Sequence, residues 1–461
     1  MKPSQLTIAA LALALSASLH AQNYKVLVNF NGSPVEPIQP GLIAQSWGGY
    51  LLTTTPDYQT SDGGTAFRVS TSGDLTNLYQ FSQAEGGLPA SGLVLGRDGE
   101  FYGTTVFGGA HNGGTVFEMT PDGIVKDLHD FANDGNGYPQ APPIQSLYGD
   151  FYGTTNGSTS NPGASNPTPG TIYKINADGT GYTLLHTFNN VDGSNPVGPL
   201  VQATDFSFYG TANHGGPNNA GTIFRTDSSG NFQVLFNFDT THGGYPQSMI
   251  QGNDGNFYGV TMLGGAGDQG TVFKMTPSFQ VTVLHSFSGG SDGSQPLGNL
   301  IQASDGYLYG TTSQGGTDGV GVLFRISTSG DFAVLHTFVR STGVGPIALI
   351  QHTDGFLYGD TNAGGSQNAG VFYRYDLGLP EFVSFLNCYG SIGETVQILG
   401  QNFTADSQVL FNGVPAQVTE LEPNYLKATV PIGATTGWIT VTTTKGVSQS
   451  DKIFIVRSPI T

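Results

Sequence analysis

The phrase Phe-Tyr-Gly-Thr-Thr recurs along this chain, in more or less altered form, at intervals of about fifty residues. It is intact at residues 101–105 and reads Leu-Tyr-Gly-Thr-Thr at residues 308–312. The other copies, the first of them degenerate, lie at residues 50–54, 151–155, 208–211, 257–259 and 357–359. A repeat of this length is a supersecondary unit that cannot bury its apolar face alone, so each unit must stack on its neighbours.

The sequence of each repeat unit predicts four short strands. In the unit that begins at Pro296, β-branched, aromatic and leucine residues occupy residues 300–302, 307–312, 322–326 and 332–338, and Gly, Asp and Ser residues separate them. Runs of this kind between turn residues are typical of strands joined by hairpins. Four antiparallel strands in about fifty residues predict one blade of a β-propeller, similar in length to a kelch unit.

The count of the fourth strand predicts how the ring closes. This strand ends at a phenylalanine after six of the repeats, but the last repeat stops at Tyr375 without a fourth strand. A matching run, residues 24–30, stands near the start of the chain instead. We expect this run to complete the last blade, because closure removes the exposed strand edges of an open stack. The sequence therefore predicts an all-β fold with a seven-bladed β-propeller closed by the N-terminal strand.

The two ends of the chain differ from the repeats. Residues 1–21 contain Lys2, then an apolar run, then a stretch rich in small residues that is typical of a cleavage site. This order predicts a signal peptide with cleavage after Ala21. From residue 379 to 461 the period is lost, and seven short apolar runs between residues 382 and 456 predict an immunoglobulin-like β-sandwich. We assign the propeller to residues 22–378.

The composition of the chain excludes some classes of binding partner. The formal net charge of −18 argues against nucleic acid and anionic lipid surfaces, which need clustered cations. No later run is long enough to span a membrane, and the single Cys388 cannot form an internal disulfide bond. With no recognisable sorting anchor, we expect an exported protein that is extracellular or at the cell surface. The oligomeric state stays open.

Two families are similar to parts of this chain. The motifs Gly-Thr-Val-Phe at residues 270–273 and Phe-Tyr-Gly-Thr-Thr, with Leu-His-x-Phe and Asp-Gly-x-x-Pro, resemble the bacterial GloVer (Gloeobacter–Verrucomicrobia) tandem repeat over residues 24–376. Residues 393–403, which read Gly-Glu-Thr-Val-Gln-Ile-Leu-Gly-Gln-Asn-Phe, resemble the IPT/TIG signature. The first resemblance implies no activity and no catalytic residues. The second implies a domain found in surface proteins and appended to carbohydrate-active enzymes.

Residues that depart from the repeat in loops are better functional candidates than residues that obey it. On this ground we expect the ligand-binding residues to include His111, His214, His242, Asp268 and Asp318. Four other histidines share one position in the fourth strand, which predicts a structural role: His129, His186, His285 and His336. Six cations share a position in the third strand, where we expect carboxylate pairing or strand capping within the blade; a ring that attracts an anion is the alternative. They are Arg68, Lys174, Arg225, Lys274, Arg325 and Arg374.

No strong catalytic, phosphate-binding or cysteine-based metal motif is present. We expect no cofactor, with calcium left open because Asp-Gly loops such as that at Asp292 offer carboxylates without a spaced Asp-x-Asp-x-Asp pattern. The leading hypothesis is a secreted or cell-surface, non-catalytic scaffold that binds a glycan or protein. The alternatives are a carbohydrate-active propeller hydrolase or lyase, and a structural protein of an envelope or matrix.

Overall fold

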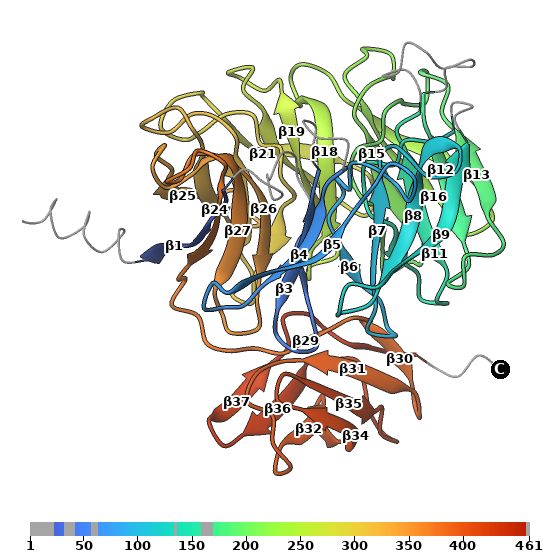
Figure 1. The fold of residues 1–461 in the computed structure, drawn as a ribbon, viewed down its shortest axis with the longest axis vertical. Coiled ribbons are helices and arrows are strands. Elements are labelled where there is room, and N and C mark those ends of the chain that lie inside the picture. The colour runs from blue at the N-terminus through green and yellow to red at the C-terminus, as the bar shows by residue number, and fades with distance from the viewer. Residues whose placement is uncertain (1–22, 32–41, 57–62, 133–135, 158–168, 458–461) are drawn as a thin grey trace, which may run out of the picture.

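The structure, a computed structural model, describes residues 23–31, 42–56, 63–132, 136–157 and 169–457. Seven four-stranded antiparallel sheets form a ring, and a smaller β-sandwich lies against one end of it (Figure 1). Among the described residues, no helix is long and apolar enough to cross a membrane. The expected signal peptide, residues 1–21, lies outside the described residues.

Six blades are each formed by consecutive strands. Blade 1 comprises β2 (Ala44–Gln45), β3 (Leu51–Thr55), β4 (Thr65–Val69) and β5 (Leu75–Gln80); blade 2 comprises β6 (Val94–Leu95), β7 (Phe101–Thr105), β8 (Asn112–Met119) and β9 (Val125–Ala132); blade 3 comprises β10 (Ile144–Gln145), β11 (Phe151–Thr155), β12 (Thr171–Ile175) and β13 (Thr183–Thr187). Blade 4 comprises β14 (Val201–Gln202), β15 (Phe208–Ala212), β16 (Thr222–Thr226) and β17 (Gln233–Asn237); blade 5 comprises β18 (Gly244–Gln251), β19 (Phe257–Leu263), β20 (Thr271–Met275) and β21 (Val281–Ser286); blade 6 comprises β22 (Ile301–Gln302), β23 (Leu308–Thr312), β24 (Val322–Ile326) and β25 (Phe332–Thr337).

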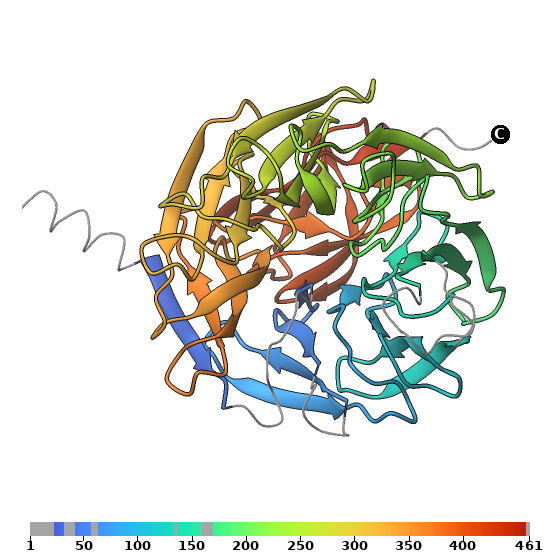
Figure 2. The same ribbon diagram turned by 90° about the horizontal axis from the view of Figure 1, so that it is seen from above.

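Blade 7 joins the two ends of the ring. Its inner strands are β26 (Val344–Gln351), β27 (Leu357–Ala363) and β28 (Val371–Tyr375), and its outer strand is β1 (Tyr24–Asn29). Strand β1 runs antiparallel to β28, with Tyr24 opposite Tyr375 and Asn29 opposite Val371. The predicted blade number and the closure by the N-terminal strand are therefore confirmed (Figure 2).

The core of the ring lies between blades rather than inside any one of them. The repeated phrase explains this arrangement: the ring of Tyr102 packs on Phe151 of the next blade, with 4.1 Å between centroids, and Tyr152 stacks on Phe208 at 4.0 Å. Each motif tyrosine that has an aspartate four residues earlier also donates a hydrogen bond to it, as Tyr102 does to Asp98 at 2.6 Å. The glycine between tyrosine and threonine leaves room for the third strand, since a Cβ on Gly103 would lie 2.6 Å from the ring of Phe117.

The histidines of the fourth strands also join blades. His285 stacks on Phe332 of the following blade at 3.8 Å, and His336 stacks on Tyr24 at 4.0 Å. Burial lowers the pKa of His285, which favours its neutral, stacking form. These contacts give the shared histidines the structural role that their repeat position predicts.

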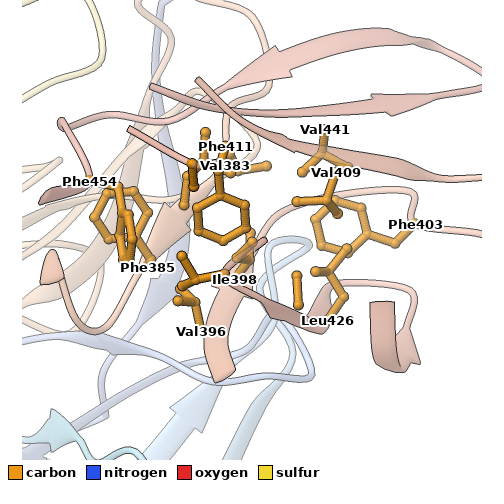
Figure 3. Packing of buried hydrophobic residues seen from close by; sticks show 14 residues of the cluster. Val383, Phe385, Val396, Ile398, Phe403, Val409, Phe411, Leu426, Val441 and Phe454 are labelled. Atoms are coloured by element: carbon orange, nitrogen blue, oxygen red, sulfur yellow. The ribbon is translucent and has the colours of Figure 1, made fainter. Parts of the chain in front are cut away.

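The C-terminal sandwich has its own core, built on Val383, Phe385, Ile398, Phe411 and Phe454 (Figure 3). It has more strands than predicted. Its sheets are formed by β29 (Ser384–Phe385), β30 (Tyr389–Ser391), β31 (Thr395–Leu399), β32 (Gln408–Phe411), β33 (Val414–Pro415), β34 (Gln417–Glu422), β35 (Tyr425–Thr429), β36 (Ile439–Thr443), β37 (Gly446–Gln449) and β38 (Ile455–Arg457). Strands β30, β33 and β37 were not predicted, because they are short and lack an apolar run.

Candidate functional site

The two faces of the ring are built from different loops. The turns between the first and second strands of the blades face the sandwich, as shown by the hydrogen bond from Tyr389 Oη to the carbonyl oxygen of Ala203 at 3.1 Å. Because the strands are antiparallel, the loops that join second to third strands and successive blades lie on the opposite face, which we call the upper face (Figure 1). All five predicted site residues lie in upper-face loops.

A cavity of about 440 Å³ lies on the ring axis, and all seven blades contribute to its wall. One repeat position dominates this wall: the residue that follows the repeat proline, which stands before the first strand or, in blades 5 and 7, inside it. Six blades supply it, as Ala90, Gln140, Val197, Gln247, Leu297 and Ile347. We call these residues the axial ring.

Local backbone geometry aims the axial ring at the cavity. The residue before each of these prolines has a positive φ, and it is bulky at Leu88 (57°), Tyr138 (66°) and Tyr245 (58°). Such residues rarely adopt this conformation, so the surrounding structure must impose it. At Tyr245 the backbone N–H is tied to the carbonyl oxygen of Ala220 at 2.8 Å, which pins the turn to the preceding blade. The chain therefore turns sharply into Pro246 and presents Gln247 to the axis.

The glycine of the Gly-Thr-x-Phe motif holds each proline in place. A Cβ on Gly270, whose φ is +98°, would lie 2.7 Å from Cδ of Pro296, and Gly321 has the same relation to Pro346. Only glycine combines this backbone conformation with such close packing. The motif thus builds a uniform support for a residue that differs from blade to blade.

The cavity wall is uncharged. Among the described residues that line it, none is Asp, Glu, Lys, Arg or His. Apolar side chains such as Val197, Leu297 and Ile347 alternate with the amides of Gln140, Gln247, Asn299 and Asn362. A wall of this kind suits an uncharged ligand that offers both apolar surface and hydrogen-bonding groups.

A buried carboxyl stands beside this wall. Asp360 occupies the second-strand position where five of the other blades have threonine and blade 5 has Val260. In four of those blades the threonine donates to the next blade, as Thr211 does to the carbonyl oxygen of Gln247 at 2.9 Å. Asp360 is 6% exposed, and its Oδ1 accepts from the backbone N–H of Ala348 at 3.2 Å. Burial raises the pKa of Asp360 to about 7. Alternate residues of a strand share a face, so Asp360 projects from the same face of β27 as Asn362.

His214 is one of the predicted residues with a distinctive setting. Its ring meets Tyr245 edge to face, with 4.9 Å between centroids, and its Nδ1 is buried without a hydrogen-bond partner. Burial lowers the pKa of His214. Because Tyr245 stands two residues before Gln247 of the axial ring, His214 is one aromatic contact away from the turn that shapes the cavity.

The other four predicted residues either make contacts within their own loops or are exposed to solvent. His242 Nδ1 lies 2.9 Å from Asp239 Oδ1 within one turn. Asp268 has a positive φ of 51° and accepts from the N–H of Gly264 at 2.9 Å, as the side chain of Asn219 does from Gly215 at 3.0 Å. His111 and Asp318 are exposed. None of the five residues is in the cavity wall, and they do not form one cluster.

The cations of the third strands are held within their blades. Lys174 Nζ lies 2.7 Å from Asp150 Oδ2, and Arg225 lies 3.8 Å from a carboxylate oxygen of Asp205. Arg374 lies over the ring of Phe356, with 4.2 Å from Cζ to the centroid. The expected carboxylate pairing within the blade is confirmed for Lys174 and Arg225, whereas Arg374 contacts an aromatic ring of its own blade instead. No group of three or more His, Cys, Asp or Glu residues that could hold a metal ion occurs in the described part of the chain.

Sequence reasoning missed the axial ring and Asp360. A signal for the ring was present, because the residue after the repeat proline varies while the proline itself is kept and the next residue is always Ser, Ala or Gly. A signal for Asp360 was the replacement of threonine in the repeated phrase. Neither signal marks an irregular polar residue in a loop, because the axial ring is largely apolar and Asp360 lies inside a strand.

Solved structures that resemble this chain are propeller-like. A catalytically inactive virginiamycin B lyase from Staphylococcus aureus, solved with quinupristin, is 17% identical with a TM-score of 0.50 over 77% of this chain and 99% of that chain. A fungal alcohol oxidase in complex with copper is 12% identical with a TM-score of 0.52 over 92% and 98% of the two chains. An oligogalacturonate lyase in complex with manganese is 11% identical with a TM-score of 0.52 over 77% and 93%. At these identities the likeness shows the fold alone.

Family models match nearly the whole chain, whereas no curated protein matches it. The Gloeobacter/Verrucomicrobia repeat matches residues 14–206, 157–302 and 207–414, and the IPT/TIG domain matches residues 380–453. The chain therefore belongs to the Gloeobacter/Verrucomicrobia repeat family and carries a C-terminal IPT/TIG domain.

Proposed function

We propose that this protein is an exported, non-catalytic scaffold whose propeller binds a neutral glycan in the axial cavity. One observation carries the proposal: in the six blades where the structure describes it, a constant support of positive-φ residue, proline and packed glycine presents a side chain that differs from blade to blade except for two glutamines. A scaffold that served only to hold the ring together would have no reason to vary its axial residues while keeping their support.

The chemistry of the wall favours a neutral glycan over other ligands. Sugars combine hydroxyl groups with apolar ring faces, and the cavity combines Gln140, Gln247 and Asn299 with Val197 and Leu297. The absence of charge in the described wall disfavours acidic sugars, nucleotides and peptides with charged termini. A protein partner bound through the upper loops is the other form of the binding hypothesis, and it would not need the cavity.

A glycan array tests the proposal. The full chain is incubated with arrayed neutral and acidic glycans, and hits are repeated with Gln140→Ala, Gln247→Ala and, as control, Gln233→Ala on the exposed outer strand β17. We expect neutral hits that both cavity variants weaken at least several-fold and that the control leaves unchanged. Hits that depend on acidic groups, or that ignore both cavity variants, contradict the proposal.

A carbohydrate-active enzyme is the second candidate, and Asp360 is the observation that favours it. A buried carboxyl with a pKa near 7 has the protonation behaviour of a general acid or base, and it lies beside the cavity wall. The array hits are therefore incubated with the protein, and products are sought by mass spectrometry. Turnover that Asp360→Asn abolishes supports the enzyme, and intact ligand after long incubation excludes it for those ligands.

A further inference from the structure

The axial channel continues below the first cavity into a second one of about 380 Å³. The two cavities share Leu42 and Asn299 in their walls, so they adjoin one another. The lower cavity lies toward blades 1, 2, 6 and 7, whose first strands line it. Residues of the sandwich also line it, and they include Phe382, Phe385, Leu386 and Leu399.

The sandwich covers this end of the channel. Figure 1 shows it beneath the ring, and Figure 2 shows its strands behind the central opening when the ring is viewed from above. The C-terminal domain therefore forms the floor of the channel.

The floor is fixed from several sides of the ring. At blade 1, Trp47 stacks on Tyr425 with 4.1 Å between centroids and 10° between planes. Across the ring, at blade 4, the hydroxyl of Tyr389 bonds to Ala203. Because blades 1 and 4 lie on opposite sides of the axis, tilting the sandwich open at either side breaks the contact on that side.

Two further hydrogen bonds contribute to the attachment. At blade 5, Asn253 Nδ2 donates to the carbonyl oxygen of Asp451 at 2.9 Å. At blade 7, Gln401 Nε2 donates to Thr353 Oγ1 at 2.8 Å. Polar and aromatic contacts spread over four blades hold the domain in one orientation.

We propose that this floor makes the channel a blind pocket that takes the free end of a neutral glycan chain and not an internal stretch. The inference rests on the proposed function and names the part of the ligand that is recognised. A polymer threads a channel only when both ends are open. In a pocket closed at the sandwich end, an internal stretch enters only by folding back on itself, whereas a chain end enters directly. The first cavity, which lies above the level of Leu42 and Asn299, is large enough for the end of a short oligosaccharide.

Binding stoichiometry against chain length tests this inference with the unmodified full chain. The probes are size-fractionated neutral glucans, mannans and xylans, and isothermal titration calorimetry gives the number of protein molecules bound per polymer chain. End recognition predicts one protein per unbranched chain at every length, with an affinity per chain that stops rising once the end fills the pocket. Recognition of internal stretches predicts a number that grows in proportion to length.

The outcomes separate the two proposals. Binding with stoichiometry proportional to length overturns the end-recognition inference and leaves the proposed function standing. Binding to none of the neutral polymers or their oligosaccharides overturns the proposed function itself. A second measurement uses the array hit blocked by a bulky group at one end and then at the other. Loss of binding by at least tenfold with one blocked end supports end recognition, and equal binding with either end blocked contradicts it.

Discussion

Gln45 and Thr353 are joined by two hydrogen bonds across the interface between blade 1 and blade 7. Gln45 Oε1 accepts from the backbone N–H of Thr353 at 3.1 Å, and Gln45 Nε2 donates to Thr353 Oγ1 at 2.8 Å. The same amide acceptor links blades elsewhere, as Gln302 does to the N–H of Asn253 at 2.8 Å. Blade 2 is the exception, with Leu95 at this position. In every blade but blade 2, the glutamine at the end of the first strand thus links neighbouring blades by hydrogen bonds.

Replacing Gln45 by leucine is expected to lower the free energy of unfolding by about 1–3 kcal/mol, because the N–H of Thr353, a residue that is 1% exposed, loses its acceptor. Urea unfolding followed by fluorescence measures this. As control, Gln233→Leu on the exposed outer strand should change stability by no more than about 0.5 kcal/mol. A Gln45→Leu protein as stable as the unchanged chain would show that the Gln45–Thr353 hydrogen bonds contribute nothing to the stability of the fold.

The N-terminal strand is expected to stabilise the ring through Tyr24. Its hydroxyl donates to the carbonyl oxygen of Thr342 at 2.7 Å, and its ring stacks on His336. Tyr24→Ala should cost about 3–5 kcal/mol of unfolding free energy, whereas Tyr24→Phe, which keeps the ring, should cost only about 0.5–1.5 kcal/mol. Equal losses in the two variants, measured in urea, would contradict the stacking role.

Gly270 is expected to be needed for its packing on Pro296 as well as for its positive φ. Gly255 is a matched control, because its φ of +79° is also positive but nothing lies within 4 Å of a Cβ built there. Gly255→Ala should cost about 1–2 kcal/mol from backbone strain alone. Gly270→Ala should cost clearly more, since the added methyl meets Pro296. Thermal or urea unfolding that ranks the two variants equally would refute the proposed support of the axial ring.

Asp360 is expected to make the ring less stable as pH rises. An unfolded aspartate loses its proton near its ordinary pKa of 3.8, whereas burial keeps the folded Asp360 protonated up to about pH 7. Between these values the folded state binds the extra proton, so the free energy of unfolding falls as pH increases and then levels off above pH 7. Asp360→Thr, which restores the residue of most blades, removes this loss and should gain about 2–4 kcal/mol over the unchanged chain by pH 8.

Unfolding curves of both proteins at pH 4, 6 and 8 measure the effect. The exposed Asp318→Thr serves as the control for replacing an aspartate by threonine in this ring. A difference between Asp360→Thr and the unchanged chain that is constant from pH 4 to 8 would contradict the assignment.

The fold was predictable because each blade repeats the same physical problem. Seven copies of the second strand, and a fourth strand missing after Tyr375 but present before Phe30, leave closure as the economical solution. Strands such as β33 escaped because two residues carry no periodicity. Their pairing is imposed by the neighbouring strand, as Val414 is paired with Phe411.

The site was harder to predict because its residues are not chemically conspicuous. Loop histidines and aspartates attract attention, yet Asp268 caps a turn and His242 pairs within its own loop. The axial wall depends on three-dimensional convergence: Ala90 and Ile347 are more than two hundred positions apart in sequence but face one cavity. Only the closed ring brings such positions together.

The most direct test of the account is the binding of the array-identified neutral glycan to Val197→Trp and Val191→Trp, measured by calorimetry. Val197 lies in the cavity wall, whereas Val191 is 76% exposed in an upper-face loop. If the glycan binds in the axial cavity, Val197→Trp fills the cavity and abolishes binding, whereas Val191→Trp binds as the unchanged chain does. Full binding by Val197→Trp together with lost binding by Val191→Trp would place the ligand on the loops and contradict the account.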